Sequence, residues 1–397
     1  MTLSINEKKL SEKLIKYRRE LHEHPELSMK EYETTKRIRK WLEEKNIKIL
    51  DLPLEVGVVA EIEGDYPGPT IALRSDIDAL PIMEDTGLDF ASKNLGVMHA
   101  CGHDFHTSSI LGAAILINER KSELHGKVRI IFQPAEENAK GADIIIKAGA
   151  LDNVEAIFGM HNKPDLPVGT IGIKSGALMA SVDRFEIDII GVGGHAGIPD
   201  NSIDPIVVAS QIVSSLQTVV SRNLTPFSNV AISITRFQAG NTWNVIPSKA
   251  ELEGTVRTFQ NDVRDIIPNL MKRNVEGIAS AFGAKVDFRW YPYAPSVYND
   301  EKYTKVVTEA ATELGYKVVE AKQSAGGEDF ALYQTKIPGY FVWMGVGGSK
   351  EWHHPSYNLD EEALIVAARY FSCLVRKVLS RLLWNILIKK VYFTWVS

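Results

Sequence analysis

One short stretch of the sequence gathers the residue types that bind metal ions. Three histidines, a cysteine and an aspartate fall within eight positions, in the run His99-Ala-Cys101-Gly-His103-Asp104-Phe105-His106. The chain has only 10 His and 2 Cys in 397 residues, so this density sets the stretch apart. Neutral imidazole and thiolate are ligands suited to zinc and similar divalent ions. A metal site is therefore favoured; a metal-free Cys–His pair or a buried polar turn is the alternative.

More ligand-type residues follow apolar segments that have the character of buried strands. Residues 127–132 lead into Gln133-Pro-Ala-Glu136-Glu137, residues 154–160 into His161, and residues 340–345 through glycines into His353-His354. In open α/β sheets, sites form outside the carboxyl ends of the strands. We therefore expect these side chains to converge on Cys101 and His103. Taken singly, the glutamates could form a solvated face, His161 could be structural, and His353-His354 could lie in a surface loop.

Five ligands and one additional carboxylate indicate a site for two metal ions. Two ions about 3.5–4 Å apart can hold an attacking water and polarise a carbonyl oxygen. A glutamate that is not a ligand can accept a proton from the water and deliver it to the leaving nitrogen. The predicted chemistry is the metal-assisted hydrolysis of an amide.

The order of predicted elements gives the fold class. Buried strands at 70–74, 127–132 and 154–160 alternate with helices, including one at 107–120, which is typical of an α/β protein with a largely parallel sheet. From residue 182 the pattern changes to β-α-β-β-α-β, the layout of a ferredoxin-like domain, with helices at 205–222 and 262–282. We predict a two-domain protein, in which a metal-binding catalytic domain (1–181 and 296–397) is interrupted by an inserted satellite domain (182–295).

Composition excludes several classes of protein. The net charge is −5, and no basic stripe supports a nucleic-acid partner. Two cysteines exclude a disulfide framework, and with no signal peptide visible we expect a cytoplasmic protein. The segment 379–396 is strongly apolar, but Lys389 and Lys390 interrupt it, so it lacks the ~20 residues of a membrane span. A core helix with an exposed tail is the main interpretation, and a membrane-surface or dimer contact is the alternative.

The motifs together resemble the M20 family of metallopeptidases and amidohydrolases, in the branch of aminoacylases, hippurate hydrolases and auxin-conjugate hydrolases. They occur in the family's order: His22-Glu-His-Pro-Glu26, Arg74-Ser-Asp76-Ile-Asp78, Met98 to His106, Gln133 to Glu137, Gly159-Met-His161 and His353-His-Pro355. The resemblance covers all but the first few residues and the tail after about Arg376. It implies an α/β catalytic domain with a ferredoxin-like satellite and two divalent ions per subunit, for which Zn, Mn, Co and Ni are all compatible.

The resemblance also implies residue roles. The metal ligands would be Cys101, His103, Glu137, His161 and His353, with His353 preferred to His354 because the ligand in this branch stands in a His-x-Pro pattern. Glu136 would be the general acid/base. Asp76 and Asp104 would orient the ligand imidazoles, and His22, His24 and Glu26 would be structural.

The inserted segment carries further implied roles. His195, in Gly193-Gly-His195, would reach a neighbouring subunit's site and stabilise an oxyanion, so a homodimer or homotetramer is expected. Asn244 and Arg257 would bind the substrate carboxylate, for which a guanidinium is well shaped. Without the resemblance, a surface charge at a strand end is the favoured interpretation of Arg257. Gly327 stands before Glu328-Asp329-Phe330 where the family often has Ser or Ala, and we expect a freer backbone there.

The predicted function is that of an amidohydrolase that cleaves N-acyl-L-amino acids. A di- or carboxypeptidase on the same dinuclear site, and a metal-retaining binding protein without catalysis, are the alternatives. An intact Glu136 argues against the binding protein, which needs ligands but no additional base. The sequence does not define the acyl group or the native metal.

Overall fold

A computed structural model describes residues 3–396, and side chains as far as residue 384, as two compact units. The first unit comprises Met1–Gly176, Tyr298–Lys322 and Leu332–Ser397. The second comprises Ala177–Val297 and Gln323–Ala331. The short elements β7 (Gly176–Met179), β14 (Val297–Asn299) and α8 (Phe330–Gln334) lie where the chain passes from one unit to the other.

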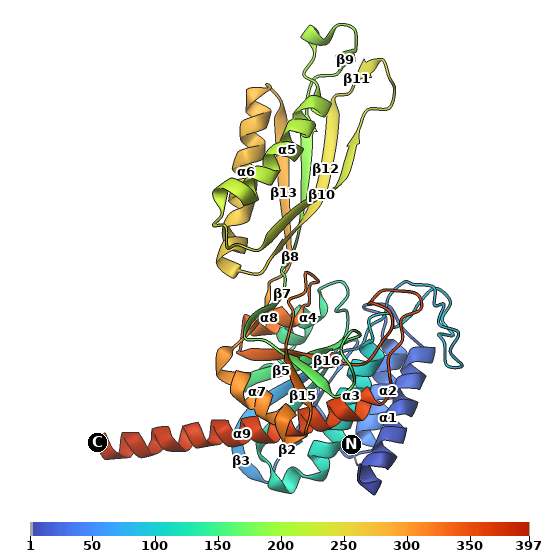
Figure 1. The fold of residues 1–397 in the computed structure, drawn as a ribbon, viewed down its shortest axis with the longest axis vertical. Coiled ribbons are helices and arrows are strands. Elements are labelled where there is room, and N and C mark those ends of the chain that lie inside the picture. Colours follow the sequence, from blue (N-terminus) through green and yellow to red (C-terminus); the bar gives the residue numbers. More distant parts are fainter. Residues whose placement is uncertain (1–2, 397) are drawn as a thin grey trace. The chain divides into compact units, whose positions relative to one another are not determined.

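The first unit is built on an eight-stranded sheet in the order β1-β2-β4-β3-β5-β16-β6-β15 (Figure 1). Its centre is parallel, because β4, β3, β5 and β16 pair in one direction, whereas β1, β2 and the β16–β6 pair are antiparallel. The central strands are buried along most of their length, as a sheet covered on both faces requires. The strands are β1 (Lys48–Ile49), β2 (Val58–Glu63), β3 (Tyr66–Asp76), β4 (His125–Gln133), β5 (Val154–Lys163), β6 (Thr170–Ile173), β15 (Lys317–Glu320) and β16 (Gly339–Gly345). The prediction of an α/β protein with a mostly parallel sheet is confirmed.

Helices pack around this sheet, and α3 is the most deeply buried of them. An added Cβ at Gly112 of α3 would lie 2.7 Å from Leu14 of α1 and 2.9 Å from Ala368 of α9, so glycine allows the three helices to approach closely. The helices are α1 (Ile5–Glu23), α2 (Tyr32–Glu43), α3 (His103–Glu119), α4 (Gly141–Lys147), α7 (Glu301–Glu313) and α9 (Ala363–Val396), with a 3₁₀ turn η1 (Lys121–Glu123).

The C-terminal segment continues α9 as far as Val396. The helix packs against α3 along its first part and then projects beyond the unit (Figure 1). Its side chains from residue 385 onward lie outside the described residues, so the expected exposed tail stays a prediction. Among the described residues, no helix has the length and apolar character needed to cross a membrane.

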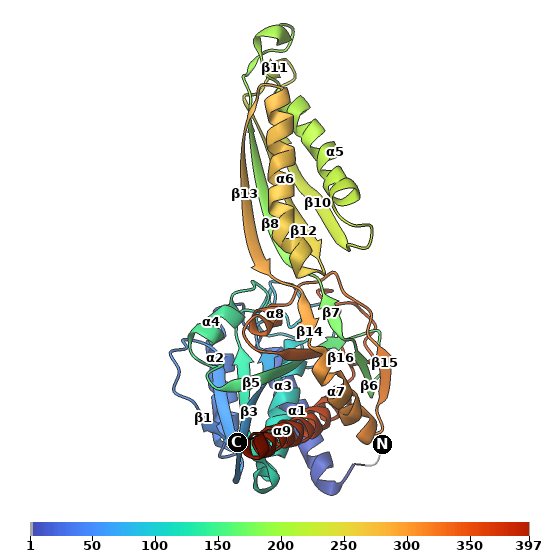
Figure 2. The same ribbon diagram turned by 90° about the vertical axis from the view of Figure 1, so that its left-hand side faces the viewer.

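The second unit contains a four-stranded antiparallel sheet in the order β10-β12-β8-β13. Two helices cover one face of the sheet (Figure 2), and buried positions alternate with half-buried ones along β8 and β12. In chain order the elements are β8 (Val182–Ile190), α5 (Pro205–Asn223), β10 (Val230–Ala239), β12 (Lys249–Thr258), α6 (Asn261–Ala281) and β13 (Lys285–Ala294). A small ladder of β9 (Gly194–His195) and β11 (Val245–Ile246), with a 3₁₀ turn η2 (Pro199–Asn201), extends from it.

Candidate metal centre

The predicted ligands lie at one edge of the sheet of the first unit, near the carboxyl ends of four neighbouring parallel strands. Glu136 and Glu137 follow β4, His161 lies near the end of β5, and His353 lies in the loop after β16. Cys101 and His103 sit at the N-terminus of α3, which follows β3 in the chain. Because β4, β3, β5 and β16 are adjacent and parallel, their carboxyl ends meet at the same edge.

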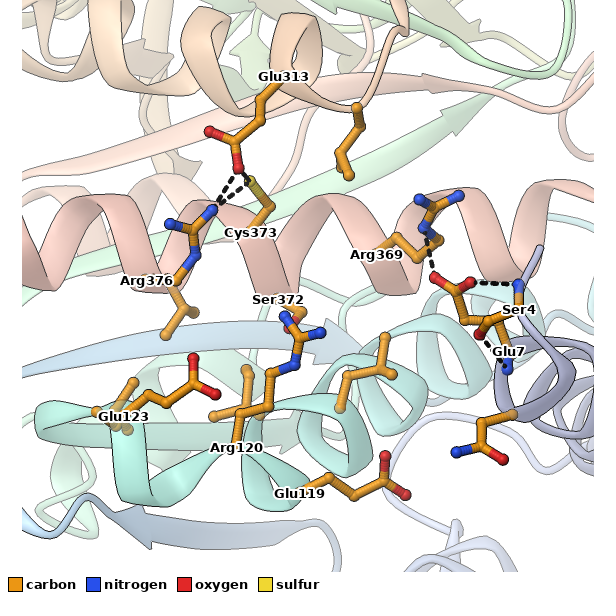
Figure 3. A pocket seen from close by; sticks show the side chains of 16 residues that line it. Ser4, Glu7, Glu119, Arg120, Glu123, Glu313, Arg369, Ser372, Cys373 and Arg376 are labelled. Atoms are coloured by element: carbon orange, nitrogen blue, oxygen red, sulfur yellow. Dashed lines mark hydrogen bonds and ion pairs between the residues drawn. The ribbon is translucent and has the colours of Figure 1, made fainter. Parts of the chain in front are cut away.

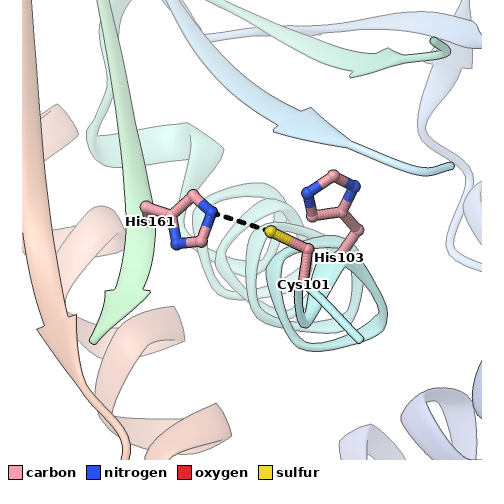
Figure 4. A group of neighbouring side chains, drawn as sticks. All are labelled: Cys101, His103 and His161. Atoms are coloured by element: carbon pink, nitrogen blue, oxygen red, sulfur yellow. Dashed lines mark hydrogen bonds between the residues drawn. The ribbon is translucent and has the colours of Figure 1, made fainter. Parts of the chain in front are cut away.

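The five predicted ligands form two groups of three that share Cys101. One group is Cys101, His103 and His161, and the other is Cys101, Glu137 and His353; within each group one ligand atom per residue lies within 4.8 Å of the others. Figure 4 shows the first group, in which Cys101 Sγ lies 3.3 Å from His161 Nε2. In the second, His353 Nε2 lies 3.7 Å from Glu137 Oε2. Cys101 is therefore the one residue common to these two groups, and its thiolate would be available as a ligand in either.

Two buried atoms of this cluster lack hydrogen-bond partners among the described residues: His103 Nε2 and Glu137 Oε1. A buried polar atom without a partner is costly unless a ligand satisfies it. Imidazole nitrogens, a thiolate and a carboxylate are a donor set that zinc and related divalent ions accept. The residues present therefore fit two divalent ions.

Of the two adjacent histidines, His353 faces the cluster. Its backbone N–H donates to Ala100 O at 2.9 Å, and its φ of 63° turns the loop toward the thiol. His354 Nδ1 instead accepts the backbone N–H of Ser356 at 3.0 Å. More than half of the His353 side chain is exposed, so this side of the cluster opens to solvent.

The backbone conformation and close packing between Cys101 and His103 require a glycine, Gly102. It caps α3 with φ 77°, and an added Cβ would lie 2.6 Å from the Asn162 side-chain nitrogen and 2.8 Å from the Tyr357 hydroxyl. That Asn162 nitrogen donates to Cys101 O at 2.6 Å. The helix therefore begins at His103, earlier than the predicted start at residue 107, and places this imidazole in its first turn.

Asp78 orients His103, a role that the sequence reasoning did not assign. Its Oδ1 lies 3.2 Å from His103 Nδ1, which leaves Nε2 for a metal ion. Its Oδ2 accepts the backbone N–H of Glu137 at 3.1 Å. The motif Arg74-Ser-Asp76-Ile-Asp78 could have indicated this role for Asp78, because residues two apart at a strand end project to the same side.

The predicted role of Asp104 is wrong. Its carboxylate binds Arg18 Nε at 3.1 Å and His22 Nδ1 at 2.9 Å, so it ties α3 to α1 and orients no metal ligand. Successive helical residues are rotated by about 100°, so Asp104 cannot face the side that His103 faces. Asp76 does bind an imidazole, but that of His106, at 2.6 Å.

Burial and neighbouring charges decide the protonation of the cluster. Burial opposes the charged form of His103, but Asp76 and Asp78 outweigh it and raise its pKa to about 10. Burial raises the pKa of Glu137 to about 7 and, with the carboxylates of Glu137 and Glu136, holds that of the Cys101 thiol well above its usual range. Divalent ions must displace these protons, so high pH favours the binding of the ions.

Glu136 is the additional carboxylate beside this ligand set. It is half-buried, and one of its oxygens lies within 4.8 Å of ligand atoms of His103 and Glu137. A carboxylate in this position lies close enough to exchange a proton with a molecule held at the cluster.

His195 and Asn244 lie beside one another in the second unit. His195 pairs with Val245 across the β9–β11 ladder, and Ala196 N–H donates to Asn244 O at 3.1 Å. His195 Nδ1 accepts the backbone N–H of Gly197 at 3.0 Å. The neutral imidazole therefore carries its proton on Nε2, and both side chains are exposed.

The Arg257 side chain in β12 is half-buried, and no hydrogen bond or ion pair is found for its guanidinium among the described residues. The carboxylate of Asp183 acts on it electrostatically but is itself bound by Arg264, whose Nη2 and Nε lie 2.7 Å and 2.9 Å from its oxygens. A half-buried guanidinium that no carboxylate contacts is a suitable place for an incoming carboxylate.

Gly327 packs beside this guanidinium. An added Cβ would lie 2.0 Å from Val182 Cγ2 and 3.5 Å from Arg257 Nη1, and its φ lies outside the left-handed region. Glycine is thus needed here for space, and the expected freer backbone is not the reason for it.

A separate pocket of about 640 Å³ lies in the first unit, among α1, α3, α7 and α9 (Figure 3). It contains none of the predicted ligands. Four of its charged side chains form ion pairs: Glu7 with Arg369 at 2.9 Å, and Glu313 with Arg376.

The mostly parallel α/β sheet, with a clustered Cys/His/Glu donor set at its carboxyl edge, is that of a metal-binding α/β protein. Residues 72–377 match the model of peptidase family M20/M25/M40, and the chain belongs to this family. Within it, the chain is 64% identical over 361 residues to an N-acetylcysteine deacetylase of Bacillus subtilis, covering 91% of this chain and 95% of that protein.

Two further relatives are named as an amidohydrolase and as a dinuclear metal-binding peptidase. An N-acyl-L-amino acid amidohydrolase of Geobacillus stearothermophilus is 43% identical over 290 residues, which is 72% of this chain and 78% of that protein. The crystal structure of a Bacillus subtilis protein, described as a dinuclear metal-binding peptidase of the M20 family, superposes with a TM-score of 0.87 at 59% identity, covering 94% of this chain and 99% of that one.

Proposed function

We propose that this protein hydrolyses the amide bond of N-acyl-L-amino acids, with two divalent metal ions held by Cys101, His103, Glu137, His161 and His353. The observation that carries the proposal is the pair of three-ligand groups that share one thiol, with Glu136 beside them but outside both. The names of the deacetylase and amidohydrolase relatives support the same bond type.

Metal ions bound in this site would polarise the acyl carbonyl and lower the pKa of a bound water. Glu136 accepts the proton of the attacking water and delivers it to the amide nitrogen as the C–N bond breaks. Asp78 holds the His103 imidazole and the Glu137 backbone in register during this exchange, through its two oxygens. The products are a carboxylic acid and a free amino acid.

The second unit supplies the remaining roles in this proposal. Arg257 and Asn244 bind the α-carboxylate of the substrate, a role that the lack of an ion pair for the Arg257 guanidinium among the described residues supports. His195 donates from Nε2 to the developing oxyanion, and the N–H of Gly197 supports this by fixing the tautomer. Substrates in which the carboxylate is replaced by a carboxamide should therefore lose binding.

We further propose that the second unit is an inserted ferredoxin-like satellite domain through which two chains form a dimer. Strand β10 is an edge strand of its sheet and is largely exposed. Several apolar side chains of the same unit are also exposed: Trp243 at 91%, Ile198 at 51%, Val245 at 48% and Phe237 at 43%. An exposed strand edge and exposed apolar side chains are typical of a protein interface. In this arrangement His195 acts in the partner's site.

Mixing two inactive variants tests the dimer. Glu136→Gln subunits keep His195, and His195→Ala subunits keep Glu136. If His195 acts across the interface, refolding the two together restores about a quarter of wild-type activity, because half of the dimers then contain one complete site. No restoration would place His195 in its own subunit's site or outside catalysis.

The amide specificity is tested with a substrate panel on the metal-loaded protein. We expect release of amino acids from N-acetyl and N-benzoyl amino acids, and none from Glu136→Gln, which should still bind two ions. Faster turnover of unmodified dipeptides would instead assign the site to a peptidase. Because Cys101 must remain reduced to bind metal as a thiolate, we also propose a reducing, cytoplasmic environment.

A further inference from the structure

Glu31 carries a fully buried carboxyl group that does not cap the helix it precedes. It stands immediately before α2, yet its side chain makes no capping hydrogen bond to that helix. The first turn of α2 is held by Glu26 instead, whose oxygens accept the backbone N–H groups of Glu33 at 3.2 Å and Thr34 at 2.7 Å. The burial of Glu31 therefore needs another explanation.

The Glu31 side chain reaches the turn that follows β4. Its Oε1 accepts the backbone N–H of Ala135 at 2.8 Å. Ala135 is buried and has φ 56°, a left-handed conformation that is unfavourable for a residue with a Cβ and that surrounding contacts must hold in place. The next residue in the chain is Glu136.

A second buried carboxylate holds the other side of Glu136. Asp78 Oδ2 accepts the N–H of Glu137 at 3.1 Å. The backbone N–H groups on both sides of Glu136 are thus bound by acidic side chains from two different segments, Glu31 before α2 and Asp78 after β3. This arrangement fixes the direction in which the Glu136 side chain leaves the turn.

We propose that Glu31 is a positioning residue for Glu136, acting through the N–H of Ala135. The inference rests on the proposed role of Glu136 as the acid/base. Glu31 Oε2 has no hydrogen-bond partner among the described residues. Besides Ala135, the carboxyl group forms hydrogen bonds with nearby backbone N–H groups, its own and that of Met29, so the Ala135 contact is the one that reaches the turn after β4. A glutamine, which keeps an acceptor oxygen in the same shape, should replace it; a methionine, which keeps the volume without the acceptor, should not.

The experiment compares Glu31→Gln and Glu31→Met in the metal-loaded full chain, with Glu26→Ala as the matched control. Glu26→Ala weakens the start of the same helix but leaves the Ala135 contact intact. We expect Glu31→Met to lower kcat by about 10- to 100-fold, since small displacements of a reacting group cost that much. KM should stay within about twofold and metal stoichiometry at two per chain, while Glu31→Gln and Glu26→Ala keep most of kcat.

Two results would overturn the proposal: an unchanged kcat in Glu31→Met, or an equal loss in Glu26→Ala, which would make the effect one of helix stability. If Glu31→Met fails to fold, a loss of kcat of about 10- to 100-fold in the folded Glu31→Gln variant would also reject the proposal, because that variant retains the acceptor. Failure of the proposed function is separate, since wild-type protein would then release no amino acid from N-acyl substrates.

Discussion

Replacing Gly102 by alanine should weaken the metal site and the fold around it. The left-handed φ of 77° costs a residue with a Cβ about 1–2 kcal/mol. The new methyl group would also lie 2.6 Å from the Asn162 side-chain nitrogen, which donates to Cys101 O. Losing that buried hydrogen bond costs a further ~1–3 kcal/mol. We therefore expect a total loss of about 2–5 kcal/mol.

The matched control is Gly96→Ala. Gly96 has φ 80°, but no atom lies within 4 Å of an added Cβ, so this variant carries the backbone cost without the clash. Urea unfolding of the metal-stripped proteins should show a loss of about 1–2 kcal/mol for Gly96→Ala and a clearly larger loss for Gly102→Ala. Metal titration should show weaker binding only in Gly102→Ala. Equal losses in the two variants, with metal binding intact in both, would refute the close packing of this turn against Asn162.

Three further predictions follow from individual contacts. Asp78→Asn should weaken metal binding about 10- to 100-fold, measured by chelator competition, because the carboxylate orients a ligand imidazole; unchanged affinity would contradict this. Burial and Asp78 raise the pKa of Glu31 from 4.5 to about 7, so the folded state binds its proton more tightly. The resulting stabilisation is complete below pH 4.5 and is lost as the pH rises to about 7, which changes the free energy of unfolding by about 3 kcal/mol. Glu31→Gln should remove this pH dependence, as measured by urea unfolding between about pH 5 and 8. Gly327→Ala should raise KM for N-acyl amino acids several-fold by displacing Val182 and Arg257, and adding Val182→Ala should restore it; no rescue would reject the steric explanation.

The order of ligand-type residues along the chain was enough to predict their convergence. Each stands at or after a strand that the apolar pattern identifies, and parallel strands bring their carboxyl ends to one edge. The two helices of the second unit were also predicted to within a residue: they were expected at 205–222 and 262–282 and are found at Pro205–Asn223 and Asn261–Ala281.

Local geometry explains what the sequence reasoning missed. Asp104 was assigned from its place in the histidine-rich run, but a helix beginning at His103 turns it toward Arg18 and His22. Conversely, Asp78 lies only two residues beyond Asp76, yet its two contacts come from residues distant in sequence. Contacts of this kind depend on side-chain direction, which the periodicity of the sequence does not encode.

The central claim is that Cys101, which is common to both ligand groups, would help to hold two metal ions in one hydrolytic site. The direct test is to strip the protein with a chelator, add back Zn, Mn, Co or Ni separately, and measure bound metal together with amino-acid release from N-acyl amino acids. Our account predicts two ions per chain and metal-dependent release for the wild type, and fewer ions with little release for Cys101→Ala. Full release without metal, or two tightly bound ions and undiminished release in Cys101→Ala, would contradict it.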